Sequence, residues 1–171
     1  DASGFSAASA VVFEFDNPPD TATLPKHGGS AVLAYDLSAD ASVDIRTQIN
    51  EYARGRRVSS PSQVLEIFPM GRWSFGHTIA VVVTKSLHIE GEQEDFESLL
   101  GNASDSDQQT YITALSQAIQ RMGLTPDQVR TATLFTVRDR NEVLNPIRNL
   151  VNRTFDAEHP VRNIEVHYKS F

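Results

Sequence analysis

Seven stretches of the chain either alternate between apolar and polar residues or are almost wholly apolar, and each predicts a β-strand. In Ala10–Phe15, the side chains of Val11, Phe13 and Phe15 fall on one side of the alternation. Successive side chains of a strand point to opposite faces, so this pattern predicts a strand with one buried face. The other predicted strands are Ala31–Leu37, Val43–Ile49, Gln63–Pro69, Thr78–Thr84, Arg130–Val137 and Arg162–Tyr168.

Within this set, Thr78–Thr84 differs because its apolar residues are not interrupted by polar ones. An unbroken run rich in β-branched residues is typical of a central strand that is covered on both faces. We therefore expect Thr78–Thr84 to lie inside a sheet and not at its edge.

A helical period of three to four residues follows Ser104–Asp107, a segment that offers several N-cap candidates. The apolar positions of this period are Tyr111, Leu115, Ala118, Ile119 and Met122. Gly123 stands where a glycine commonly ends a helix. Thr125–Gln128 then has the form of a capping box with proline at the first helical position. The pattern predicts a helix, a tight stop at Gly123 and one more short helical turn.

A second helix is predicted over Asp139–Phe155, with Pro146 expected to kink or restart it and Asn145 as a candidate cap. Its apolar positions are Val143, Leu144, Ile147, Leu150 and Val151. The helices form an insertion at about 93–129 and a tail, and they do not alternate with strands, which disfavours a doubly wound sheet. The spacing of the strands indicates a sandwich, so the expected fold class is mainly β with helical insertions (α+β).

Composition and charge exclude several classes of partner and site. The chain has 171 residues, a net charge of −7 and a pI of about 5.1, which disfavours nucleic acid and anionic membranes as main partners. It contains no cysteine, which excludes disulfides, thiolate-bound metals and a cysteine nucleophile. The longest apolar run, Ile79–Val83, is far shorter than the roughly 20 residues of a membrane-spanning helix. Because the chain begins at Asp1 without an initiator methionine or a signal peptide, we expect it to be a segment of a longer protein.

The surroundings of Ser74 approach a hydrolase motif without matching it. A serine hydrolase elbow requires Gly-x-Ser-x-Gly between a strand and a helix. In Gly71–Gly76, one residue too many precedes Ser74, and the segment lies between two predicted strands. The favoured interpretation is therefore a connection within a hairpin. A hydrolase would need Ser74, His77, an acid partner within hydrogen-bond reach of His77, and a pocket at that turn.

Metal sites are also disfavoured by spacing. The histidines are His27, His77, His88, His159 and His167, and no pair has the His-x-x-x-His spacing that joins two imidazoles on one helical face. Two acidic groups could supply oxygens to calcium, namely Asp36, Asp40 and Asp44, and Asn102, Asp105 and Asp107. Neither fits an EF-hand loop, and turn and cap roles explain them. We expect no catalytic residue, cofactor or metal ligand, and leave calcium at the acidic turns open.

Taken together, several stretches resemble the N-terminal domain that precedes the α/β-hydrolase region in bacterial virulence-factor-type lipases and related secreted esterases. The matching stretches are Asp1–Ser6, Phe13–Pro18, Gly29–Leu37, Val64–Pro69, Gly76–Leu87, Phe96–Leu100 and Val129–Val137. The resemblance is a pattern of strands and turns up to about residue 151. Two departures are Ile79, where an aromatic residue is commoner in the family, and Val137, where a small polar residue is.

The resemblance implies an Ig-like accessory domain over residues 1–155, followed by a linker and the first strand of a following region at 156–171. It also implies an extracytoplasmic protein, secreted or lipid-anchored to the bacterial envelope. The expected partner is a downstream hydrolase domain of the same chain. The candidate interface residues are Trp73, Phe75, Val143, Ile147 and Leu150.

Two other classes of function stay open. One is a stand-alone surface binding or adhesion module, in which Trp73, Phe75 and Tyr52 would form an exposed aromatic patch. The other is a hydrolase that uses Ser74 and His77. Burial of the three aromatic side chains would oppose the first, and a Ser74 locked in a turn would oppose the second.

Overall fold

The computed structural model describes residues 4–50, 63–91, 96, 100 and 105–156. The chain forms two compact units, Asp1–Asp139 and Arg140–Phe171, which are described separately below. We expected the domain to extend to residue 155. The boundary between the two compact units falls before the last helix, on which none of the described apolar side chains is fully buried. The expected domain bounds stay a prediction.

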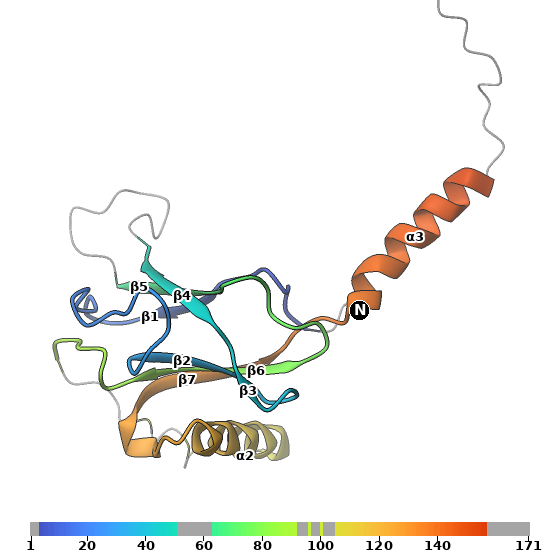
Figure 1. Ribbon diagram of the computed structural model, residues 1–171. Coiled ribbons are helices and arrows are strands. Elements are labelled where there is room, and N and C mark those ends of the chain that lie inside the picture. The colour runs from blue at the N-terminus through green and yellow to red at the C-terminus, as the bar shows by residue number, and fades with distance from the viewer. Residues whose placement is uncertain (1–3, 51–62, 92–95, 97–99, 101–104, 157–171) are drawn as a thin grey trace, which may run out of the picture. The chain divides into compact units, whose positions relative to one another are not determined.

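The first unit is a mixed α+β structure with two antiparallel sheets and a helix (Figure 1). One sheet has the strand order β1-β5-β4, and the other has the order β3-β2-β6-β7. The strands of the first sheet are β1 (Val11–Glu14), β5 (Val64–Pro69) and β4 (Ile45–Ile49). The strands of the second are β3 (Ala41–Ser42), β2 (Val32–Asp36), β6 (Thr78–Thr84) and β7 (Val129–Thr136).

The central position predicted for Thr78–Thr84 is confirmed. Strand β6 pairs with β2 on one side and β7 on the other, and every side chain from Ile79 to Thr84 is buried. Its two faces serve different clusters, since Val81 belongs to the core between the sheets and Val82 packs towards the helix. Because both faces of β6 are covered, neither set of alternate side chains faces solvent and needs to be polar, which explains the unbroken apolar run.

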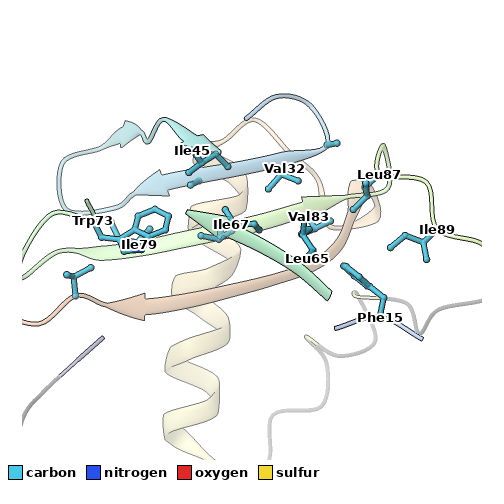
Figure 2. Close-up of a cluster of buried hydrophobic side chains, with 14 of the residues drawn as sticks. Phe15, Val32, Ile45, Leu65, Ile67, Trp73, Ile79, Val83, Leu87 and Ile89 are labelled. Atoms are coloured by element: carbon cyan, nitrogen blue, oxygen red, sulfur yellow. The ribbon is translucent and has the colours of Figure 1, made fainter. Parts of the chain in front are cut away.

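The main core lies between the two sheets, as Figure 2 shows. Ile67 of β5 faces residues of the other sheet, including Ile79 and Val83 of β6. Each of these three side chains is fully buried, so the two sheets share one continuous apolar interior. Burial of an aliphatic side chain contributes about 1.5–3 kcal/mol, so this cluster is the main source of stability.

Helix α2 (Ser106–Arg121) covers the outer face of the four-stranded sheet (Figure 1). Asp105 caps its N-terminus by accepting bonds from two backbone N–H groups. At its C-terminus, Gly123 has a φ of 73°, and Leu124 N–H donates to the Ile119 carbonyl at 3.1 Å. This is the glycine-terminated stop that the sequence predicts. The predicted short turn follows as η2 (Pro126–Gln128), with the Gln128 side chain accepting from Thr125 N–H.

One strand was missed in the sequence, one prediction about a helix needs correction, and two predictions fall wholly or partly outside the described residues. The two-residue strand β3 was not predicted, because a strand this short leaves no alternation to detect. The second unit contains α3 (Arg140–Asp156), which runs through Pro146 without a break. Of the two effects predicted for Pro146, a kink or a restart, the restart is therefore wrong. The strand predicted at Arg162–Tyr168 and part of the 93–129 insertion lie outside the described residues.

No helix in the described part of the chain combines the length and the apolar character needed to span a membrane.

Candidate functional site

Ser74 and His77 lie at the two ends of a tight turn that leads into β6. The His77 N–H donates to the Ser74 carbonyl at 3.3 Å, and Gly76 has a φ of 74°. A positive φ at the third position of a turn is the requirement of a type II turn, and glycine meets it without strain. The turn joins β5 to β6, which belong to different sheets. The predicted hairpin is therefore wrong, and the segment crosses from one sheet to the other.

A buried carboxylate reaches His77 from another part of the chain. Asp36 is 3% exposed at the end of β2, on the same face as Val32 and Ala34. Its Oδ2 lies 2.7 Å from His77 Nδ1, and its Oδ1 accepts from the N–H groups of Ser38 and Ala39 at 3.0 and 2.9 Å. Both carboxylate oxygens therefore have partners, as a buried charge requires.

The Asp36–His77 pair was missed in the sequence because the residues are 41 positions apart. One signal was present. In the strand predicted at Ala31–Leu37, Val32, Ala34 and Asp36 fall on the same side of the alternation. A carboxylate on a buried face must have a donor nearby. The alternation thus indicated that the Asp36 carboxylate needs a hydrogen-bond donor nearby, although not which residue supplies that donor.

Chemically, this arrangement supplies two of the three parts of a nucleophilic triad. A carboxylate bonded to Nδ1 orients an imidazole so that its other nitrogen can act as a base. The Ser74 side chain is exposed, but among the described residues no hydrogen bond joins its hydroxyl to the His77 ring. The same carboxylate also holds the turn after β2. The pair therefore has a structural role whether or not it takes part in a reaction.

The expected aromatic interface at Trp73 and Phe75 is not an exposed surface. Trp73 is 1% exposed, and its Nε1–H donates to the Ser9 carbonyl at 2.8 Å. Its ring packs edge-on against Phe135 with centroids 5.5 Å apart. Phe75 is half-buried against the same core. Trp73 is thus a core residue and not an interface residue.

Helix α3, in the second unit, carries the rest of the expected interface. Ile147 is 57% exposed and Leu150 is 66% exposed. The side chain of Val143 lies outside the described residues. Two further apolar side chains on the helix are also open to solvent, Val151 at 43% and Phe155 at 81%. The structure therefore places Ile147 and Leu150 on an exposed apolar face, as the helical spacing predicts.

Some of the acidic residues considered for calcium are engaged in other contacts. Asp40 accepts from the Tyr35 hydroxyl at 2.8 Å and pairs with Arg121 at 3.1 Å. The hydrogen bond to the Asp40 carboxylate raises the pKa of Tyr35, because the bond holds the phenol in its neutral form. Asp105 caps α2, and Asn102 lies outside the described residues. Within the described ranges, no three histidine or acidic side chains gather in a geometry that could hold a metal ion.

Two hollows lie on opposite sides of the first unit's core, and neither is lined by Ser74 or His77. The first, of about 460 Å³, is lined mainly by the segments around β2 and β4, including Val32, Val43 and Ile45. The second, of about 430 Å³, lies between β1 and β7 and has Trp73 and Phe135 in its wall.

Comparison with known proteins adds no assignment. No protein-family model matches the chain, and no curated protein and no solved structure is significantly similar to it.

Proposed function

We propose that this chain is a non-catalytic, Ig-like accessory domain of a larger secreted or cell-envelope lipase- or esterase-like protein. In this proposal, the apolar face of α3 packs against the hydrolase domain of the same polypeptide and orients it. The observation that carries the proposal is that face, because Ile147, Leu150 and Phe155 of this amphipathic helix are exposed among the residues that the structure describes.

The strand order supports the Ig-like part of the proposal. In an Ig sandwich, strands B, E and D are neighbours in one sheet, while C, F and G form the other, with C′ beyond C in variable-type domains. Here β1, β5 and β4 take the places of B, E and D. The sheet β3-β2-β6-β7 takes the places of C′, C, F and G. The helical segment containing α2 is then an insertion between F and G, where Ig loops tolerate extra chain.

An exposed apolar helix face has a direct consequence when a partner is present. A helix that buries four large side chains gains several kcal/mol, at about 25 cal/mol for each Å² of apolar surface removed from water. A polar face opposite the apolar one keeps the helix soluble before it docks, and Asn149, Asn152 and Arg153 occupy that side. The helix would therefore act as a connector that becomes buried once the following domain is folded.

Thiol labelling tests this proposal, because the natural chain has no cysteine. We expect Leu150→Cys to react rapidly with a maleimide in this chain alone. In the full polypeptide that includes the hydrolase region, its reaction should slow by about tenfold or more, since a buried thiol is inaccessible to the reagent. Asn149→Cys, on the polar side of the same helix, is the matched control and should react equally fast in both. Equal reactivity of the Leu150→Cys thiol in both proteins would contradict docking through this face.

A hydrolase is the second candidate, and the contact between Asp36 and His77 favours it. The pair meets the requirement for an acid partner within hydrogen-bond reach of the histidine. A proton transfer from Ser74 to His77 would further require the hydroxyl to turn towards the ring when substrate binds. Support for the hydrolase hypothesis would therefore be ester hydrolysis that is lost when Ser74 is replaced.

A further inference from the structure

The hollow of about 430 Å³ between β1 and β7 is a slot that is closed at one end. Its two long walls are the stretches Ala10–Phe13 and Ala132–Phe135, which belong to different sheets (Figure 1). At the usual rise of a strand, each wall runs for about 10 Å. The segment Phe5–Ala10 closes one end, because it leads from its bridge with the end of β7 across to the start of β1.

Aromatic rings form the closed end of the slot. Phe5 and Trp73 both pack edge-on against Phe135, with ring centroids 5.6 and 5.5 Å from the Phe135 centroid. The backbone N–H and the indole N–H of Trp73 both donate to the crossing segment, to the carbonyls of Ala7 and Ser9, each at 2.8 Å. The closed end is therefore a preformed apolar surface, as is typical of sites for small molecules.

None of the described residues that line the slot is charged. The lining consists of apolar side chains together with Ser6, Ser9 and Thr133. The hollow beside β2 and β4 differs, since His27 and Asp44 lie in its wall. An ionised group that leaves water for an uncharged, apolar wall loses solvation without gaining a partner. The slot therefore suits an uncharged, apolar molecule.

Thr133 places one hydrogen-bonding group inside the slot. It stands opposite Val81 of β6, whose side chain belongs to the core between the sheets, so Thr133 also lies on the core-facing side of its strand. Among the described residues, the Thr133 hydroxyl has no hydrogen-bond partner. Hydroxyl groups beside an apolar interior usually have a partner. An oxygen atom of a bound molecule can supply one here.

We propose that the slot binds a linear aliphatic alcohol of medium chain length. The chain lies along the two strand walls with its methyl end against the rings of Trp73 and Phe135, and its hydroxyl bonds to that of Thr133. Val11 and Phe13 face the slot and are only half-buried, so a bound chain would remove more of their apolar surface from water. The site is separate from α3 and from Ser74, and it adds a ligand to the proposed function.

Trp73 supplies the readout, because it is the only tryptophan of the chain and lies in the wall of the slot. Titration with 8-bromo-1-octanol should quench the fluorescence of Trp73 in a saturable way, since bromine quenches an indole that it contacts. 1-Octanol should compete and restore the fluorescence. Octanoate should not compete, because its carboxylate finds no cation in the lining. Quenching that rises with concentration without saturating would overturn the proposal, and so would competition by octanoate equal to that of 1-octanol.

Variants of Thr133 place the ligand in the slot. Thr133→Phe fills the slot and should abolish the saturable quenching. Thr133→Val keeps the shape of the side chain and removes the hydroxyl, so binding should weaken by about three- to tenfold, the effect of one lost hydrogen bond. Thr131→Val is the matched control, because Thr131 lies on the same side of β7, opposite Val83, but not in the lining of the slot. Equal affinities of Thr133→Val and Thr131→Val would contradict the site.

Discussion

Replacing Trp73 by alanine should lower the free energy of unfolding by about 3–5 kcal/mol, the loss typical of a large aromatic side chain removed from a core. Trp73 is 1% exposed, contacts Phe135 and ties the segment after Phe5 to the core through its bond to the Ser9 carbonyl. Denaturant unfolding followed by far-ultraviolet circular dichroism measures the effect, since the substitution removes the chain's single tryptophan fluorophore.

Trp73→Phe serves as the matched variant. It keeps an aromatic ring in the core and loses the indole N–H, so the expected cost is smaller, about 1–3 kcal/mol. If Trp73→Ala lowers the free energy of unfolding by less than about 1 kcal/mol, this side chain is not packed in the interior and is again a candidate contact residue.

Replacing Asp36 by alanine should lower the free energy of unfolding by about 2–4 kcal/mol. The substitution leaves three donors without their acceptor: the N–H groups of Ser38 and Ala39, and the Nδ1 of His77. Because Asp36 is buried, water does not freely replace the lost acceptor. Equilibrium unfolding in urea at neutral pH measures the change.

Asp40→Asn is the control for Asp36→Ala. Asp40 lies near the same turn, but its side chain is 70% exposed and its ion pair with Arg121 is open to solvent. Exposed ion pairs contribute about 0–1 kcal/mol, and asparagine tolerates the positive φ of 53° at this position. If Asp36→Ala costs no more than Asp40→Asn, the buried carboxylate is not the anchor that its hydrogen bonds indicate.

Local patterns predicted most of the elements. Alternation or a mostly apolar run identified β1, β2, β4, β5 and β7 to within a few residues, and the unbroken apolar run of Thr78–Thr84 identified β6, which is buried on both faces. The end of α2 was also predictable, since a glycine stop at Gly123 and the following capping box depend only on neighbouring residues. These features are local, so the sequence alone carries the information.

Long-range contacts were not predictable in the same way. The partner of Asp36 lies 41 positions away, and the residue that accepts the bond from Trp73 lies 64 positions away. Trp73, which lies between Gly71 and Gly76, was interpreted as a contact residue, because the local sequence does not show whether an aromatic side chain packs in the core. The crossing of Gly71–Gly76 between sheets was likewise invisible, since hairpins and crossovers can share the same turn residues.

We propose above all that the polar groups around Ser74 hold turns and do not carry out a reaction. The most direct test is the hydrolysis of short acyl esters by this chain, measured alongside its Ser74→Ala and His77→Ala variants. The account predicts that the three proteins release product at the same rate as buffer. Turnover by the wild-type chain that disappears in Ser74→Ala, while circular dichroism shows the fold intact, would contradict it.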